Sequence, residues 1–330
     1  MIITRTPYRI SFVGGGTDLR NYYKNSQGKV ISTTIDKYIY VVIKRQVGIV
    51  EYKYRINYST VEICNEINEI KHPIVREALK FFEIDWPLEI TTFSDIPGQT
   101  GLGSSSAFAV GLIHGLFAIK GEMATKHKIS SLAAKIEIQH LKRNIGKQDH
   151  FASAYGNLNV IVFNKDESVN IEPVFHTPEI RNELENKLML FYTFLKRDAN
   201  IILKSQNDNT QKNIVYLDEM KDLVDVFRDI INSGSNINKL GEILDHSWKL
   251  KKSLSSDISN DKINGYYNNA LQSGAIGGKL LGAGGGGFLL ILANSEDHDT
   301  IKSALSDLFY MPFKFDQGGT RITYYDQTTF

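Results

Sequence analysis

The pattern of apolar and polar positions in the first part of the chain indicates mainly β-structure. Ile2–Val13 alternates imperfectly, and Val30–Lys44 is rich in β-branched and aromatic residues. Arg55–Ile63 and Pro87–Phe93 add two further candidate strands, whereas His72–Phe82 has the spacing of a short helix. This part of the chain is therefore predicted to be strands with one helix among them.

A change in pattern follows at Pro97–Ser106, where glycine and serine indicate a loop. Apolar residues then recur at helical spacing over Ala107–Ile119, and Ser130–Arg143 predicts a second helix. Asn157–Phe163 and Val169–Phe175 predict two strands that pair through the polar turn between them.

The second part of the chain has a largely helical pattern. A strand is predicted at Lys187–Leu195 and another at Phe288–Ala293, with a helix at His298–Leu308 and terminal strands after it. Between the two strands the spacing predicts four helices, at Ala199–Ser205, Lys212–Ile231, Ile237–Leu254 and Ile258–Leu271. The polar stretch around Val169–Asn186 is the predicted boundary between two domains, 1–180 and 181–330.

Composition narrows the class of protein. The 330 residues carry 38 basic and 37 acidic side chains, and this balance argues against nucleic acid as a partner. With Cys64 as the one cysteine, no intrachain disulfide can form. No apolar run approaches the ~18 residues of a membrane span, and the N-terminus does not resemble a signal peptide. The expected location is the cytoplasm, without a membrane partner, and the oligomeric state stays open, a homo-oligomer included.

The loop Gly101-Leu102-Gly103-Ser104-Ser105-Ser106 is the first candidate site. Glycines let the backbone approach a ligand closely, and N–H groups converge where a helix begins, so the segment is typical of phosphate binding. Serine hydroxyls add donors for phosphate or a ligand for magnesium. The alternative is a flexible linker before an N-capped helix. It is not a Walker loop, because no lysine follows the glycines in that pattern.

Two further glycine clusters lie near the two ends of the chain. Gly282–Gly287 matches GxGxxG literally, but an apolar strand rather than a helix follows it, which argues against a dinucleotide site. A turn that lets the backbone pass close to another element fits better. The cluster Gly14–Gly16, followed by Thr17 and Asp18, is by itself only a turn with an acidic end.

Candidate acids lie at Glu137 and Asp149, the second within Gly146-Lys147-Gln148-Asp149. Phosphoryl transfer needs positioning, neutralisation of charge and one group that orients or deprotonates the nucleophile, and a carboxylate beside a lysine suits that last role. Spacing alone does not separate either acid from a solvated surface charge. The eight histidines form no HExxH motif, so a metal hydrolase is not indicated, and His140 and His150 are interpreted as structural.

Three segments together resemble the three motifs of the GHMP kinases, the superfamily of galactokinase, homoserine, mevalonate and phosphomevalonate kinases. They are Thr6–Asp18, Pro97–Ala107 with its GLGSSSA core, and Lys279–Phe288. Their order and spacing across nearly the whole chain make the resemblance specific. Arg5–Leu19 and Gly146–Asp149 are similar to one branch, the sugar 1-kinases of the heptose 7-phosphate type.

The resemblance implies a two-domain α+β fold, with an N-terminal domain like the second domain of ribosomal protein S5 and a ferredoxin-like C-terminal domain. It implies a phosphotransferase with an alcohol acceptor, ATP and Mg²⁺ as cofactors, and a small sugar phosphate as substrate. The product would serve the synthesis of activated heptose for capsule or lipopolysaccharide.

Carried over by residue, the resemblance makes Asp149 the catalytic aspartate, with Lys147 nearby to keep it ionised, and places Arg9 near the transferred phosphate. Glu137 and Ser105 match the magnesium ligands, although Ser104 or Ser106 could share that role. The segment Gly101–Ser106 would bind ATP.

Substrate contacts are implied for a second group of residues. Asp18 would hold sugar hydroxyls beside Gly15, Gly16 and Thr17, and the turn with Gly284 and Gly285 would close on the site. For a substrate phosphate the candidates are Arg20, Lys147, Lys196 and Arg197, with Arg197 favoured because arginine binds phosphate in a bidentate manner.

The chain departs from its apparent relatives at three places. Gly15-Gly16 stand where galactokinases have Glu-His, His150 follows GKQD where this branch usually has glutamine, and Thr193–Arg197 lacks a glycine that the branch tends to have. The rival interpretations are another sugar 1-kinase such as a fucose or galactose type, an isoprenoid-precursor kinase, a ligand-sensing regulator without catalysis, and an NAD-dependent dehydrogenase.

Overall fold

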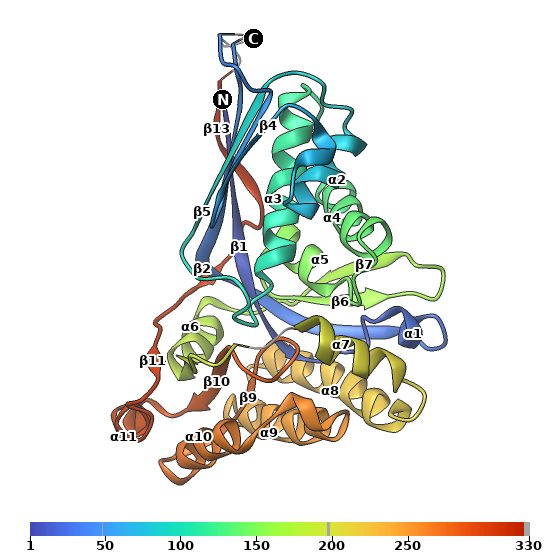
Figure 1. Cartoon of the computed structure of the whole chain (residues 1–330). Helices are drawn as coiled ribbons and strands as arrows, with labels where there is room; N and C mark the ends of the chain where they lie inside the picture. Colours follow the sequence, from blue (N-terminus) through green and yellow to red (C-terminus); the bar gives the residue numbers. More distant parts are fainter. Residues whose placement is uncertain (48, 197–198, 327–330) are drawn as a thin grey trace.

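The computed structural model describes residues 1–47, 49–196 and 199–326, and Figure 1 labels its elements. In this part of the chain nine strands form one sheet and four form a second. The strands of the first sheet are β1 (Ile2–Val13), β2 (Gly28–Arg45), β3 (Tyr54–Asn57), β4 (Val61–Cys64), β5 (Leu88–Ser94), β6 (Asn159–Phe163), β7 (Val169–Pro173), β12 (Phe315–Asp316) and β13 (Arg321–Tyr325). Those of the second are β8 (Leu188–Tyr192), β9 (Ala275–Leu280), β10 (Phe288–Ala293) and β11 (Phe309–Tyr310).

Of the described α-helices, five precede β6 along the chain and six follow β7 (Figure 1). The first group is α1 (Arg20–Tyr23), α2 (Pro73–Phe81), α3 (Ser104–Ile119), α4 (Lys126–Lys135) and α5 (Gln148–Tyr155). The second group is α6 (Pro178–Lys187), α7 (Ala199–Asp208), α8 (Ile214–Ser233), α9 (Asn238–Ser253), α10 (Asp261–Gln272) and α11 (His298–Ala304). Among the described residues, no helix is both long and apolar enough to cross a membrane.

The long strand β2 holds the first sheet together. Its second half pairs with β5, its first half pairs with β6, and β1 runs antiparallel along most of its length. The order β13-β1-β2-β5-β3-β4 continues the sheet on both sides. Because β1 pairs with β2 from Ile2 to Val13, and with β13 over Ile2–Arg5, the residues that follow one another along it are held in register with β2.

Helix α3 forms the core on one face of this sheet (Figure 1). Phe108, Leu112 and Leu116 are buried as the helical spacing predicts, and Ile113 and Phe117 on other sides of the helix are buried as well. A helix that is apolar all round is a core helix. Its N-terminus, at the glycine- and serine-rich loop, is thereby held at a fixed place.

Most predicted elements are confirmed in type and position. The strands expected at Ile2–Val13 and Phe288–Ala293 have these bounds, and the strands β6 and β7 pair through the predicted turn. The helical pattern after residue 199 corresponds to α7, α8, α9 and α10. The α+β class is confirmed with them.

Two predictions of local structure are wrong, and one helix was not predicted. Arg55–Ile63 is a hairpin of β3 and β4 rather than one strand, because the polar residues between Asn57 and Val61 turn the chain. The helix expected over Ser130–Arg143 ends as α4 at Lys135 and continues as a π-helical turn, Ile136–His140. The polar boundary stretch contains α6, whose start carries a Thr177 cap followed by Pro178, a recognisable N-terminal signal.

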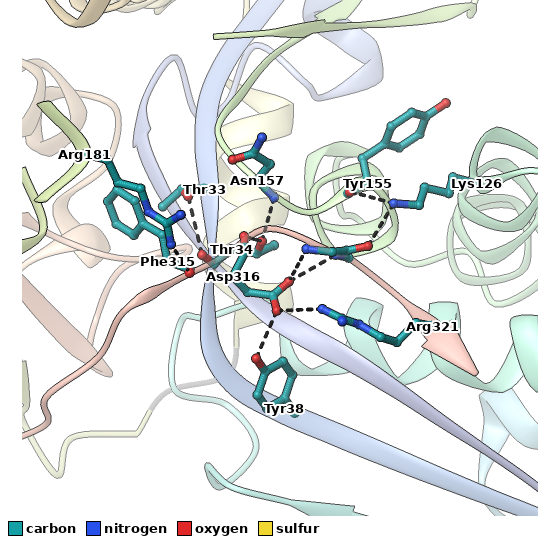
Figure 2. A network of polar contacts seen from close by, with 12 residues as sticks. Thr33, Thr34, Tyr38, Lys126, Tyr155, Asn157, Arg181, Phe315, Asp316 and Arg321 are labelled. Carbon is teal, nitrogen blue, oxygen red and sulfur yellow. Dashed lines mark hydrogen bonds and ion pairs between the residues drawn. The ribbon is translucent and has the colours of Figure 1, made fainter. Parts of the chain in front are cut away.

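The end of the chain returns to the first sheet, where β12 pairs with β2 and β13 with β1. Figure 2 shows the polar network that fixes this return around Asp316. Its carboxylate accepts hydrogen bonds from Tyr38 (2.9 Å), the backbone of Gly318 (2.9 Å) and Gly319 (3.1 Å), and Arg321 (3.1 Å). The division at residue 180 stays a prediction, and β12 and β13 belong spatially with its first part.

The Asp316→Asn variant should lose about 2 to 4 kcal/mol of unfolding free energy. An amide keeps the size of the side chain but replaces one accepting oxygen with a donor, while the residue is 6% exposed. Urea denaturation measures the loss, and Asp307→Asn, at an exposed position, should stay within about 0.5 kcal/mol of the wild type. Equal stability of the two variants would contradict this role of Asp316.

Candidate active site

A cavity of about 330 Å³ lies where the three glycine clusters meet. This volume is within the usual range for small-molecule sites. Its lining includes most of the predicted site residues: Arg9, Gly15, Gly16, Asp18, Gly101, Gly103, Ser104, Ser105, Ser106, Glu137 and Asp149. Residues far apart in sequence therefore meet here, as the motif spacing predicts.

The phosphate-loop candidate forms the first turn of α3. Gly103 occupies the N-cap position in a left-handed conformation (φ 78°) and provides no side-chain cap, and Ser104 begins the helix. The first N–H groups of a helix have no acceptor within it and, together with the helix dipole, favour an anion. This end of the cavity is therefore suited to phosphate.

The third glycine cluster supports the loop by close backbone contact. A Cβ atom on Gly282 would lie 2.5 Å from the Cα of Gly101, and one on Gly101 would lie 2.6 Å from the carbonyl oxygen of Leu281. The Phe288 N–H donates to the Thr100 carbonyl at 3.1 Å. The prediction that this cluster is a turn of close backbone approach is confirmed.

Arg9 and Asp149 form a bidentate ion pair at the centre of the cavity. The Nε and Nη2 atoms of Arg9 lie 2.7 and 2.8 Å from the two carboxylate oxygens, and Nη1 donates to the Gly101 carbonyl at 2.7 Å. The Arg9 side chain is 4% exposed and that of Asp149 is 23% exposed. One guanidinium thus joins β1, the phosphate loop and the first turn of α5.

The prediction that Lys147 accompanies Asp149 is wrong, because the lysine points elsewhere. Its Nζ donates to the Glu167 carbonyl at 3.0 Å and lies 4.8 Å from the centre of the Tyr23 ring. Lys147 is the N-cap residue of α5 and Asp149 lies two positions further on, and residues at this spacing do not face each other on a helix. Arg9 provides the charge instead.

Glu137 lies on the π-helical turn and is fully buried. Its carboxylate accepts from Ser105 Oγ (2.7 Å) and Arg143 Nη1 (2.5 Å), and lies 2.8 Å from His150 Nε2. Burial would raise its pKa, but the bonds from His150 and Ser105 and the charge of Arg143 outweigh this and lower the pKa. The side chain is therefore an ionised oxygen donor beside the phosphate loop.

Asp18 is buried in the cavity wall, where it accepts from the backbone N–H groups of Gln148 (3.2 Å) and Gly16 (3.1 Å). A Cβ on Gly146 would lie 1.8 Å from its Oδ2, so the glycine of the GKQD segment makes room for this carboxylate. Burial and the charge of Asp149 raise the pKa of Asp18 to about 6, against the opposing effect of the N–H donors.

Besides Lys147, four predicted site residues are not part of the cavity lining. Thr17 is buried and donates to the carbonyls of Gly14 (2.8 Å) and Lys29 (2.9 Å), so its hydroxyl shapes the turn. Leu102 is buried and its carbonyl accepts from the Arg9 N–H. Gly284 and Gly285 contact Ile258 and are not part of the cavity lining. The Gly285 N–H donates to the Ile258 carbonyl at 2.8 Å, and Gly284 packs against the Ile258 backbone. Arg197 lies outside the described residues.

The lining also includes residues that were not predicted from the sequence, among them Gln148, Arg143, Lys251 and Lys279. Gln148 lies inside the quoted GKQD segment and joins Ser11 (2.9 Å) to Asp18 (3.3 Å). Lys279 begins the third motif, whereas no pattern in the sequence distinguishes Lys251 or Arg143 from a surface cation. Among the described residues, no group of three or more His, Cys, Asp or Glu side chains could hold a metal ion.

Comparison with known proteins identifies the family. The model for the GHMP kinases N terminal domain matches residues 73–157, and that for the GHMP kinases C terminal matches residues 220–310. The chain belongs to the GHMP kinases, and the predicted fold is confirmed. It is accordingly a phosphotransferase with an alcohol group as acceptor, and the family uses ATP as phosphate donor.

Several relatives are similar along the whole chain. The D-glycero-alpha-D-manno-heptose 7-phosphate kinase of Campylobacter jejuni is 29% identical, over 97% of this chain and 98% of its own. A putative sugar kinase structure from the same species has 25% identity, a TM-score of 0.73 and 97% coverage of both chains. A D-glycero-D-manno-heptose 1-phosphate kinase structure from Bacteroides thetaiotaomicron has 22% identity and a TM-score of 0.80, covering 99% of this chain and 100% of its own.

The raised pKa of Asp18 predicts a specific dependence of stability on pH. In the ligand-free protein the folded state binds this proton more tightly than the unfolded state, whose carboxyl has a pKa of 3.8. The stabilisation is complete below about pH 4 and is lost as the pH rises through about 6. Relative to Asp18→Asn, the wild type should therefore lose up to roughly 3 kcal/mol between pH 4 and pH 7.

Urea denaturation of both proteins across this range measures the difference. The Asp307→Asn variant, changed at an exposed carboxyl, should follow the wild type at every pH. A constant difference between wild type and Asp18→Asn from pH 4 to pH 7 would show that the carboxyl titrates normally.

Proposed function

We propose that this protein is the ATP-dependent kinase that phosphorylates the anomeric hydroxyl of D-glycero-D-manno-heptose 7-phosphate, giving the 1,7-bisphosphate. The observation that carries the proposal is the position of the Arg9 guanidinium. It donates two hydrogen bonds to the Asp149 carboxylate and a third to the Gly101 carbonyl of the phosphate loop. A base for the acceptor and a cation for the transferred group are thereby placed at the loop that would hold ATP.

The proposed step is a direct in-line transfer. The anomeric oxygen of the sugar attacks the γ-phosphorus of ATP, the bond from that phosphorus to the β–γ bridging oxygen breaks, and ADP leaves. The Asp149 carboxylate accepts the hydroxyl proton as the new bond forms. Arg9 stabilises the charge that develops on the transferred group, and the N–H groups at the start of α3 hold the phosphates.

The oxygen donors beside the loop fit a magnesium ion. Glu137 and Ser105 offer a carboxylate and a hydroxyl oxygen 2.7 Å apart, and Mg²⁺ prefers oxygen ligands and takes few of them from protein. Arg143 Nη1 already contacts both oxygens, so this pair of atoms attracts a cation. When bound, the ion would neutralise charge on the β- and γ-phosphates. Ser105 is favoured over Ser104 and Ser106 because its hydroxyl contacts Glu137.

Polar residues of the cavity lining beside Asp149 support a sugar as the acceptor. Asp18 and Gln148 offer polar groups for sugar hydroxyls, and Gly15 and Gly16 leave the adjoining space without side chains. We infer that the absence of these side chains admits a sugar longer than a hexose. The 29% identity over the full length with a heptose 7-phosphate kinase supports the particular acceptor.

We further propose that the protein works in the cytoplasm, where ATP is available, and that its product enters the synthesis of GDP- or ADP-heptose for surface polysaccharide. Another sugar 1-kinase of the same fold is the alternative, because relatives named galactokinase and fucokinase also match most of this chain.

The Asp149→Asn variant should lose roughly 10²- to 10⁴-fold in kcat with little change in the KM for ATP, because the base is lost while the loop is intact. Steady-state release of ADP measures both constants. The matched control is Asp299→Asn, since Asp299 also lies in the first turn of a helix but is 97% exposed. Near-native turnover of Asp149→Asn would refute the role of this aspartate.

Release of ADP with magnesium-ATP should be selective among five acceptors: heptose 7-phosphate, mannose 6-phosphate, fucose, galactose and mevalonate. We expect the largest kcat/KM with heptose 7-phosphate. Turnover of only another sugar would retain the kinase and replace the substrate. A folded protein that binds ATP and turns over none of the five would favour the ligand-sensing regulator.

A further inference from the structure

Two buried lysines in the cavity have no part in the mechanism above. Lys251 lies on α9 and is 6% exposed, and Lys279 lies on β9 and is 3% exposed. The Lys251 amine donates to the Gly282 carbonyl, and Lys279 Nζ donates to the Phe12 carbonyl at 2.6 Å. None of the ion pairs in the described ranges joins either lysine to a carboxylate.

Burying an ammonium group without a counter-charge is costly unless a ligand supplies the missing anion. Burial and the charge of Arg9 lower the pKa of Lys251 to about 8, against the opposing effect of the Asp18 and Asp149 carboxylates, with which it forms no ion pair. Burial and the charges of Lys251 and Arg9 lower that of Lys279. The three cations are thus close enough to repel one another, and this wall of the cavity is poised to receive negative charge.

The position of Lys279 separates it from the ATP phosphates. Its amine contacts the carbonyl of Phe12, three residues along β1 from Arg9, which corresponds to about 10 Å of extended strand. Arg9 holds the phosphate loop, whereas Phe12 leads into the Gly14–Gly16 turn. Lys251, whose amine donates to the Gly282 carbonyl beside Gly101, lies at the end of this wall near the loop, and Lys279 lies at the end towards the part of the cavity proposed for the far end of the sugar.

Of the four basic residues suggested by the sequence, Lys196 is exposed, Arg197 lies outside the described residues, and Arg20 and Lys147 are not part of the cavity lining. Arg20 and Lys24 lie 2.8 and 2.9 Å from the Glu167 carboxylate, and Lys147 donates to the carbonyl of the same residue. They form a separate cluster around Glu167, and the cavity lining does not include them among the described residues.

We propose that Lys279 and Lys251 bind the phosphate group that the acceptor sugar already carries. This inference rests on the proposed function and deepens it: the site selects sugars that bear a phosphate remote from the reacting hydroxyl. Two charge-assisted hydrogen bonds to a phosphate dianion would compensate both buried ammonium groups. The bonds that the lysines make to backbone carbonyls hold the amines in place before the substrate arrives.

The test compares kcat/KM for matched acceptors with and without the phosphate, namely heptose 7-phosphate against heptose and mannose 6-phosphate against mannose. In Lys279→Met and in Lys251→Met the ratio of phosphorylated to unphosphorylated acceptor should fall roughly tenfold to hundredfold. The control is Lys252→Met, at the next position on α9, where the lysine lies over the Trp248 ring and the wild-type ratio should persist.

A second readout uses inorganic phosphate as probe. It should inhibit the wild type competitively with the sugar phosphate, and this inhibition should weaken in both lysine variants. An unchanged selectivity ratio, or a loss expressed only in the KM for ATP, would overturn the assignment. Circular dichroism establishes which variants are folded. If Lys279→Met does not fold, Lys251→Met must by itself show the fall in the selectivity ratio.

These outcomes separate the two proposals. If the wild type prefers a different sugar phosphate and the variants lose that preference, the subsite stands while the heptose substrate falls. If the wild type acts on heptose 7-phosphate and the variants keep its selectivity, the function stands while the subsite falls.

Discussion

The bidentate contact between Arg9 and Asp149 is the constraint on which the site depends. Arg9 uses Nε and Nη2 for the carboxylate, Nη1 for the Gly101 carbonyl and its own N–H for the Leu102 carbonyl. A lysine could not make this set of contacts, because its ammonium is a single point of charge without a planar fork. The strand, the loop and the helix are therefore positioned by one side chain, which lies on a strand that is itself paired with β2.

Burial opposes the charges at three other groups in the cavity. The pKa of Asp18 is raised mainly because it is buried, and those of Lys251 and Lys279 are lowered for the same reason. Each of these buried groups lowers the free energy of unfolding, and the burial of the extensive apolar cores around the two sheets offsets this loss. Such groups are more easily explained by a ligand than by folding.

The sequence predicts the parts of the fold that depend on local pattern. Element type follows from periodicity, and the glycine clusters show where chain segments approach a ligand or one another. The single strand expected at Arg55–Ile63 is a hairpin because the residues between Asn57 and Val61 turn the chain, so that β4 pairs with β3 while β3 pairs with β5. The π-helical turn at Glu137 likewise has no periodic signal, although it carries a buried carboxylate.

The candidate site was predictable where motif residues themselves line the cavity. Arg9, Asp18 and Asp149 come together as the resemblance to the GHMP kinases implies. Proximity in sequence misled at Lys147, because side chains two positions apart on a helix diverge. Lys251 could not be predicted, since only the packing of α9 against β9 turns this lysine inward while Lys249 on the same helix stays 66% exposed.

The segments that build the site come from the beginning, the middle and the end of the chain, because they contact one another directly. The loop at Gly101 is shaped by backbone contact with Gly282, and Lys279 reaches from the second sheet to the Phe12 carbonyl on β1. Strands β12 and β13 then bring the chain back to β2 and β1. Neither sheet with its helices encloses the cavity alone, because its walls come from both. Geometry at the point of transfer therefore depends on how the two sheets are held together, and the buried Lys279 is one of the contacts that hold them.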